Sequence, residues 1–178
     1  MKIKIERPDE SAAASIFSRY LTPDLPYGAS EIASLGGGEV EKAIRVMIEK
    51  TVREMYRTDE DNRFLEVTYQ GGDKEILYYK DFSSGAMIEN IVRRAKKLAI
   101  KREIAGQVGG ITTDDLIQSI AKEYKEHEDL PNTTNPDDWA KISGKKGERI
   151  IYVRTLVTQG KEAKGGRSIE RVGTGQYL

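Results

Sequence analysis

A strand pair and a distant third strand set the strongest limit on the fold of this chain. The segment RFLEVTYQGGDKEILYYKDF, residues 63–82, has the two-residue period of strands and is interrupted by a Gly-Gly-Asp turn. Leu65, Val67 and Tyr69 share one side of the first strand. The sequence therefore predicts a β-hairpin over about 63–82.

An isolated hairpin is only marginally stable in water, so this one needs a further partner. The segment ERIIYVRTLV, residues 148–157, is rich in β-branched residues and supplies a late third strand. We expect the hairpin and this strand to form a small mixed sheet. The sheet serves either to reinforce the domain or as a docking surface, and the sequence leaves both roles open.

Helix-like segments account for most of the remaining chain. Apolar residues recur at helical spacing in four ranges: 9–20, 40–55, 84–102, and a segment that begins at Thr112. Asp115 stands three residues after Thr112, as in a capping box. The stretch before residue 40 contains LGGGEV and is typical of a flexible connector. The predicted fold class is α+β, with about four helices.

The first residues, MKIKIERPD, alternate like a strand, yet a helix follows before any second strand. Two interpretations remain open for residues 1–8. The segment is an ordinary edge strand that pairs with something later in the chain, or it is the remnant of a domain whose other strands lie upstream, in which case the chain is a piece of a longer protein.

Composition narrows the classes of function. Acidic and basic residues balance at 29 each, so no overall charge favours nucleic acid or an anionic membrane. Cysteine is absent, which excludes disulfides and Cys-ligated zinc. The sequence contains neither an apolar run long enough to span a bilayer nor a signal-peptide core. We expect a cytoplasmic protein without a membrane partner.

Candidates for catalysis or metal binding are weak. The glycine run near residue 37 lacks the lysine and hydroxyl residue that a phosphate-binding loop requires. His127, the sole histidine, lies near a predicted helix end, where a solvated or carbonyl-bonded ring is more typical than a general base. The acidic groups 59–61 and 137–138 lack the ligand spacing of a calcium loop. We therefore expect no metal site and no self-sufficient active site.

A basic helix face supports one alternative function. Within the 84–102 helix, four cations share a face opposite the apolar stripe: Arg93, Arg94, Lys97 and Lys101. A helical module that binds nucleic acid through this face is therefore an alternative hypothesis. No aromatic residues interleave with these cations and no groove-reading motif accompanies them, so a solvated face is the favoured interpretation.

Four stretches of the chain resemble one family of proteins. They are KIKIERPDESAAASIFSRYL, FSSGAMIENIVRRAKKLAIK, EDLPNTTNPDDWAKISGKKGERIIYVRTLV and the ending TGQYL. Together they resemble the C-terminal part of the bacterial proteasomal AAA ATPases, the Mpa or ARC family. The resemblance implies the small helical lid subdomain of an AAA protein over 9–157, a remnant strand of the large subdomain over 1–8, and a tail over 158–178.

The resemblance also implies what the parent protein does. Members of this family form homohexameric rings that use ATP and magnesium to unfold proteins tagged with Pup and deliver them to the 20S proteasome core particle. The Walker A and Walker B motifs that hold ATP and magnesium are absent from this chain. We therefore expect the chain to be inactive alone, to bind no cofactor tightly, and to contribute a lid with contacts to neighbouring subunits.

The resemblance assigns nucleotide sensing to Ser84, Gly85 and Ala86. In AAA proteins the matching segment opens the helix that closes over the nucleotide. Small residues suit that place, because a longer side chain would keep the helix N-terminus from approaching the ligand. Capping by Ser84, with glycine required for close packing, is the alternative interpretation, and the two roles are compatible.

The last predicted site is the terminus Gln176, Tyr177 and Leu178. Residues 158–178 are rich in glycine and charge, which is typical of a flexible tail. A tether of about 18 residues has a reach of roughly 25 Å. The tyrosine ring and the free carboxylate suit a pocket with a cation or backbone amides. By resemblance, these residues dock on the outer ring of the core particle and favour opening of its gate.

Overall fold

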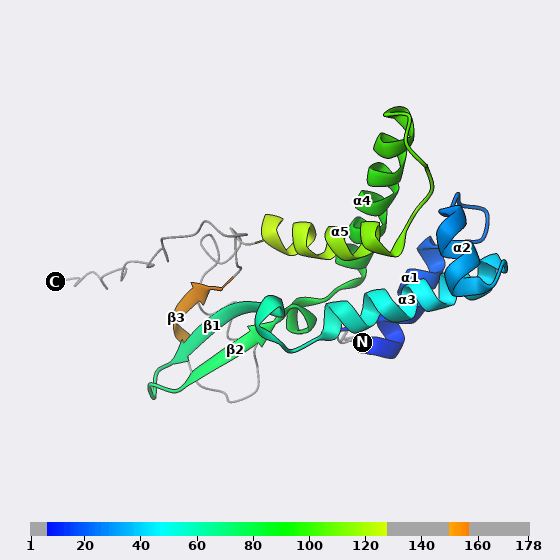
Figure 1. Cartoon of the computed structure of the whole chain (residues 1–178). Helices are drawn as coiled ribbons and strands as arrows, with labels where there is room; N and C mark the ends of the chain where they lie inside the picture. The colour runs from blue at the N-terminus through cyan, green and yellow to red at the C-terminus, as the bar shows by residue number, and fades with distance from the viewer. Residues whose placement is uncertain (1–6, 128–149, 157–178) are drawn as a thin grey trace, which may run out of the picture. The chain divides into compact units, whose positions relative to one another are not determined.

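The computed structural model describes residues 7–127 and 150–156 and confirms the predicted α+β class (Figure 1). Most of residues 1–8, the ends of the predicted late strand and the tail 158–178 lie outside the described residues. The described chain falls into two compact units. Of the described residues, the helical unit takes in 7–62 and 78–126, and the sheet unit takes in 63–77, 127 and 150–156.

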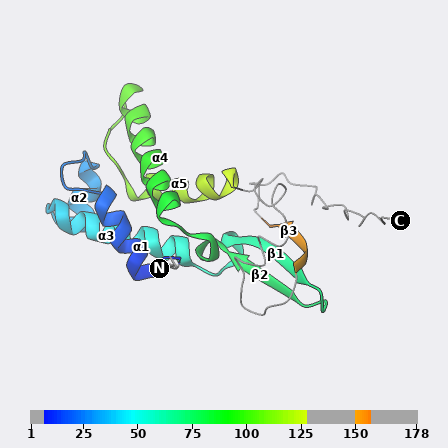
Figure 2. The same cartoon turned by 180° about the vertical axis from the view of Figure 1, so that it is seen from behind.

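The helical unit contains five α-helices among the described residues: α1 (Glu10–Tyr20), α2 (Ala29–Gly36), α3 (Val40–Tyr56), α4 (Gly85–Ile104) and α5 (Thr113–Glu126). Helix α1 packs on α3 and α4, while α5 packs on α3 and α4. Helices α4 and α5 contact each other, and both views show them crossing at a large angle (Figures 1 and 2). The core lies between these helices and includes the fully buried side chains of Phe17, Met47, Ile91 and Leu116.

The first predicted helix and the fourth begin as their sequences indicate. Asp9 caps α1, because its Oδ1 accepts a hydrogen bond from the amide of Ala12 at 2.7 Å. At α5, the amide of Asp115 donates to the hydroxyl of Thr112 at 3.2 Å, and the Asp115 carboxylate accepts from the Thr112 amide at 2.9 Å. The predicted capping box is confirmed in this reciprocal form.

The structure differs from the prediction in the stretch before residue 40, which was expected to be a flexible connector. This stretch contains α2, so the described residues hold five helices where four were predicted. Gly37 ends α2 in the left-handed conformation, with φ of 62°, and its amide donates to the carbonyl of Ala33 at 3.2 Å. The glycine run thus stops a short helix. Gly36 also contacts α3 closely, since an added Cβ would lie 3.0 Å from the Cβ of Ala43.

The sheet unit contains β1 (Arg63–Tyr69), β2 (Lys74–Tyr78) and β3 (Ile150–Thr155), in the order β2-β1-β3. The predicted hairpin and late strand are both confirmed. Strands β1 and β3 pair antiparallel, and the tight turn makes β1 and β2 antiparallel as well, so the sheet is not mixed as predicted. The reason is geometric, since the long connection from β2 to β3 leaves either direction open and the sequence alone does not choose.

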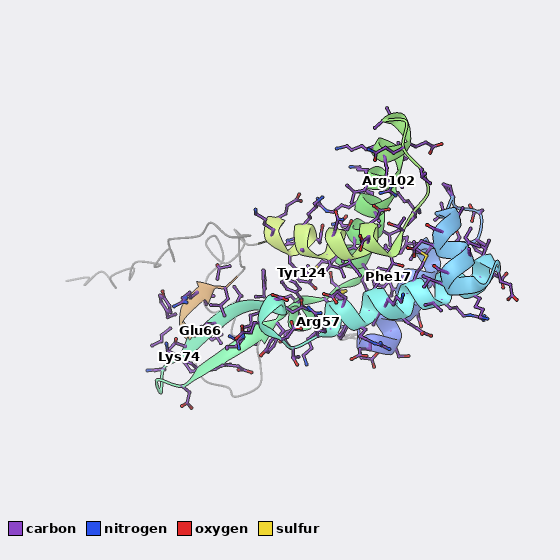
Figure 3. The ribbon with its side chains drawn as sticks, in the orientation of Figure 1. Phe17, Arg57, Glu66, Lys74, Arg102 and Tyr124 are labelled. Carbon is purple, nitrogen blue, oxygen red and sulfur yellow. The ribbon has the colours of Figure 1, made fainter. Side chains whose placement is uncertain are left out.

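The register of β1 and β3 matches the predicted alternation. Val67 lies opposite Val153, and both side chains are buried, as are Leu65 and Tyr69 on the same face of β1. A register shift lies between Thr68 and Tyr69. The remaining face of β1 carries Glu66, which accepts a hydrogen bond from Lys74 of β2 at 3.3 Å (Figure 3) and lies opposite Arg154 of β3. From Leu65 to Tyr69 burial alternates and marks the inner face, while Phe64 at the start of the strand is buried on the opposite face.

Candidate functional site

The three predicted nucleotide-sensing residues lie at the N-terminus of α4. Ser84 is the N-cap, in an extended conformation, and its Oγ accepts a hydrogen bond from the amide of Met87 at 3.3 Å. Gly85 is the first residue of the helix and is half-buried, and Ala86 is exposed. The first amides of a helix have no partner within it and carry partial positive charge, so this terminus can approach an anionic ligand.

Gly85 is not required by packing within the described chain. A Cβ added to it would have no heavy-atom neighbour within 4 Å, and its backbone is outside the left-handed region that favours glycine. Glycine lowers helix stability relative to alanine by roughly 0.5–1 kcal/mol. The close-packing alternative for Gly85 therefore finds no support among the described residues, and the glycine leaves the helix terminus open instead.

The residue before the cap is held in the interior of the helical unit. Ser83 has a side chain with 0% exposure, and its Oγ lies 3.0 Å from the carbonyl of Lys80 and 3.1 Å from the hydroxyl of Tyr56. The Tyr56 hydroxyl donates to the carbonyl of Pro8 at 2.5 Å. Burial raises the pKa of the Tyr56 phenol, although the hydrogen bond with Ser83 partly offsets this.

Aromatic contacts hold the short segment that leads into α4. The rings of Tyr79 and Tyr124 stack in parallel with centroids 4.1 Å apart, and the Tyr124 hydroxyl donates to the carbonyl of Tyr79 at 2.9 Å. Burial raises the pKa of the Tyr124 phenol well above its usual value. The guanidinium of Arg7 lies 5.4 Å from the ring centroid of Phe82, within the range of a cation–π contact. The entry to α4 is thus fixed before the helix begins.

Sequence reasoning missed Tyr56 and Ser83 as members of this arrangement. Tyr56 is the last residue of α3, and Ser83 lies 27 positions later. The only sequence signal was that two serines, Ser83 and Ser84, are adjacent, because a helix needs one serine as its cap and the second must have another role. The contact that joins Tyr56 to Ser83 is tertiary, and no local pattern encodes it.

Comparison of the sequence with known protein families shows which family the chain belongs to. The profile described as "ARC, AAA+ ATPase lid domain" matches residues 8–177. The chain belongs to the ARC lid domain family. The family resemblance found in the sequence is thereby confirmed.

Curated relatives of the ARC lid are similar along its whole length. The "Proteasome-associated ATPase" of Acidimicrobium ferrooxidans is 72% identical over 178 residues, which is 100% of this chain and 31% of the relative. Proteins of the same description from Frankia casuarinae and Kineococcus radiotolerans are 57% and 58% identical over 179 residues, covering 100% of this chain and 30% and 31% of those relatives. The chain therefore spans about 30% of the length of these relatives.

The basic face that suggested nucleic-acid binding is partly neutralised in the ARC lid. Arg94 donates to the buried carboxylate of Glu123 at 2.9 Å and to Glu126 at 2.8 Å, both on α5. These hydrogen bonds, led by the one with Glu126, raise the pKa of the Arg94 guanidinium. Arg93 pairs with Glu89 at 2.9 Å. Two of the four predicted cations thus bind carboxylates, which weakens the nucleic-acid alternative.

The remaining weak candidates form no reactive cluster in the described part of the ARC lid. Arg57 pairs with Asp59 at 2.7 Å and with Asp61 at 3.6 Å, so these acids stabilise a turn. Within residues 7–127 and 150–156, no group of three or more metal-ligating side chains converges, and no helix is long and apolar enough to cross a membrane. His127 directly follows α5. The acidic pair 137–138 and the terminal site Gln176, Tyr177 and Leu178 lie outside the described residues.

Proposed function

We propose that this chain is the lid and tail of a ring-forming, proteasome-associated AAA ATPase, in which the lid senses nucleotide and the tail docks on the proteasome core particle. The observation that carries the proposal is the family match over residues 8–177, which takes in both the N-terminus of α4 and the residues Gln176 and Tyr177. The three relatives support it, since each is described as a proteasome-associated ATPase.

The lid's part in nucleotide sensing follows from the chemistry of α4. Ser84 fixes the start of the helix by accepting from the Met87 amide, and the amides of Gly85 and Ala86, which come before it, offer donors and partial positive charge to an anionic ligand. Gly85 adds no side chain in the direction of approach. In this proposal ATP and magnesium are held mainly by the remainder of the ATPase, and the lid completes the site. This chain alone therefore binds nucleotide weakly and does not hydrolyse it.

A graded series at Gly85 tests this role. Because Gly85 has open space and an ordinary helical backbone, Gly85→Ala leaves stability unchanged or raises it by up to about 1 kcal/mol. In a full-length proteasome-associated ATPase whose corresponding region is replaced by this chain, Gly85→Leu lowers nucleotide affinity by about tenfold or more, and Gly85→Ala lowers it less. The readout is titration with a fluorescent nucleotide, together with the midpoint of urea unfolding.

The matched control for this series is Ala29→Leu. Ala29 is likewise the first residue of a helix and is exposed, so the substitution introduces the same side chain at an equivalent position of α2. We expect it to leave nucleotide affinity unchanged. Equal affinities across the Gly85 series, in variants with wild-type stability, would disprove the nucleotide-sensing role.

The tail's part rests on the terminal residues. The Tyr177 ring offers rigid apolar area with a polar tip, and the carboxylate of Leu178 can meet a cation or backbone amides. A three-residue anchor binds weakly on its own. Six copies in a homohexamer raise the overall affinity by roughly two to four orders of magnitude if their spacing matches the sockets of the core particle's outer ring. Docking in those sockets favours gate opening.

The full protein acts, in this proposal, on proteins tagged with Pup, which it unfolds in the cytoplasm and passes to the core particle. The ARC lid contributes contacts to the neighbouring subunits of the ring, so that nucleotide turnover in one subunit alters the position of the next.

A further inference from the structure

One hydroxyl group joins three separate segments of the helical unit. Tyr56, at the end of α3, donates its phenolic hydrogen to the carbonyl of Pro8 at 2.5 Å and lies 3.1 Å from the Oγ of Ser83. Pro8 directly precedes Asp9, the N-cap of α1, and Ser83 directly precedes Ser84, the N-cap of α4. The starts of two helices, 75 residues apart in the sequence, are therefore linked through the Tyr56 hydroxyl, beside a longer direct contact of 3.5 Å from the Ser83 Oγ to the Pro8 carbonyl.

The hydroxyl hydrogens of Tyr56 and Ser83 can form a chain of hydrogen bonds with one direction. Tyr56 has one hydroxyl hydrogen, and it is used by the carbonyl of Pro8. The contact between Ser83 and Tyr56 therefore requires Ser83 to be the donor. Ser83 also has one hydrogen and a second acceptor at a similar distance, the carbonyl of Lys80 at 3.0 Å. Its hydroxyl can thus point along the chain Ser83–Tyr56–Pro8, back to Lys80, or over a longer distance of 3.5 Å straight to the Pro8 carbonyl.

The surroundings keep these bonds from being exchanged for water. The Ser83 side chain is fully buried and Tyr56 is half-buried. Burial raises the pKa of the Tyr56 phenol, so at neutral pH it retains the hydrogen that Pro8 accepts. A second contact joins the same two segments, because the guanidinium of Arg7 lies over the ring of Phe82. The Tyr56 link, the longer direct contact between Ser83 and Pro8, and this cation–π contact thus all connect residues 7–8 with residues 82–83.

We infer that Tyr56 is a positioning residue that couples the N-terminus of α4 to the start of α1, so that a ligand bound at α4 alters the geometry of the chain at Pro8. The inference rests on the proposed nucleotide role of α4 and deepens it by naming the group that transmits the signal. Tyr56 contacts no ligand in this scheme. It acts through Ser83, which is covalently adjacent to the cap of α4.

The test is amide hydrogen exchange in a full-length proteasome-associated ATPase that carries this chain, with and without ADP. The probes are first-turn amides with known acceptors: Ala12 and Ala13 in α1, and Met87 and Ile88 in α4. In the wild type, ADP slows exchange at both pairs. In Tyr56→Phe, which removes only the hydroxyl, ADP still slows exchange at Met87 and Ile88 but no longer at Ala12 and Ala13.

Nucleotide-free samples give a second, independent readout. Loss of the shared hydroxyl speeds exchange in both first turns by about three- to tenfold. Ser83→Ala breaks the same link from the other side and has the same two effects, which keeps the inference testable if Tyr56→Phe folds poorly. Tyr27→Phe is the matched control, because it removes a hydroxyl that donates to the carbonyl of Thr22 at 2.9 Å in the same unit. It leaves the response to ADP intact at both pairs.

The outcomes separate the two proposals. If ADP protects both pairs of amides in Tyr56→Phe and in Ser83→Ala, the coupling is wrong and the nucleotide role stands. The coupling is also wrong if wild-type ADP protection is confined to Met87 and Ile88. If ADP leaves Met87 and Ile88 unprotected in the wild type, the nucleotide role fails, and the inference that rests on it fails with it.

Discussion

The guanidinium of Arg102 and the carboxylate of Asp115 form a two-bond ion pair, with both N–O distances equal to 2.7 Å. Arg102 lies near the end of α4 (Figure 3), and Asp115 is in the first turn of α5 with 3% exposure. Arg102 also donates to the carbonyls of Val108 and Gly110, at 3.1 and 2.7 Å. One side chain thus holds the loop between α4 and α5 at two carbonyls and the first turn of α5 at its carboxylate.

Breaking this pair destabilises the helical unit. Asp115→Asn leaves the Arg102 charge without its carboxylate and weakens the cap of α5, so we expect unfolding free energy to fall by about 1.5–3 kcal/mol. The loss is smaller than for a fully buried pair because the Arg102 side chain is 26% exposed. Urea unfolding followed by far-ultraviolet circular dichroism measures it. Arg93→Gln, which breaks a pair with 61% exposure of the arginine, is the control and costs under about 0.5 kcal/mol.

The same pair makes stability depend on pH in a defined direction. Burial opposes ionisation of Asp115, but hydrogen bonds from Arg102 and Thr112 outweigh it and hold the pKa of Asp115 below its usual value. A carboxyl with a lowered folded pKa contributes stability above its unfolded pKa of about 3.9, and this is lost as the pH falls through the folded pKa. The stability difference between wild type and Asp115→Asn therefore shrinks as the pH falls below about 4. A constant difference between pH 7 and pH 3 contradicts this account.

Gly110 is predicted to tolerate no side chain. Its φ is 91°, and an added Cβ would lie 2.5 Å from the carbonyl carbon of Tyr27, on the segment that bridges to Ile111. Gly106 has φ of 74° in the same loop, but a Cβ there meets no atom within 4 Å. Gly106→Ala therefore costs only backbone strain, about 1–2 kcal/mol. Gly110→Ala costs several kcal/mol more, and equal unfolding midpoints for the two variants would refute the close contact.

The register of β1 and β3 can be tested by cross-linking. The chain has no cysteine, so introduced pairs have no competing thiols. Val67 and Val153 lie directly opposite each other, where antiparallel Cα atoms are about 4.5–5.5 Å apart and a disulfide fits. Val67→Cys with Val153→Cys forms the bond on mild oxidation, as detected by mass spectrometry of unreduced peptides. Val67→Cys with Arg154→Cys does not, because the neighbouring side chain points to the other face.

Local periodicity predicted much of this fold because it records burial directly. Leu65, Val67 and Tyr69 are buried on one face of β1 as the alternation indicates, and the Thr112–Asp115 capping box is formed as its spacing indicates. Helix α2 was missed because eight residues give too few turns for a clear period, and the adjacent glycines resemble a linker. Strand direction was wrong because it depends on the path of a long connection.

The candidate site was predictable only in part, for a different reason. Ser84 shows its capping role locally, and resemblance to a family marked Gly85 and Ala86. The Tyr56 link and the neutralisation of Arg94 by Glu123 both join residues far apart in the sequence. Such contacts are created by packing, so charge patterns along one helix overstate how basic its surface is. The basic face that was predicted for α4 is an example, because two of its four cations pair with carboxylates.

The most direct test of the proteasomal account is binding to a bacterial proteasome core particle. The chain is displayed densely on a sensor to restore multivalency, beside a version that lacks Gln176, Tyr177 and Leu178 and a matched version with Thr174→Ala. The account predicts that the intact chain and Thr174→Ala bind and that the shortened chain does not. Equal binding of the intact and shortened chains, or no binding by any of them at high density, would contradict it.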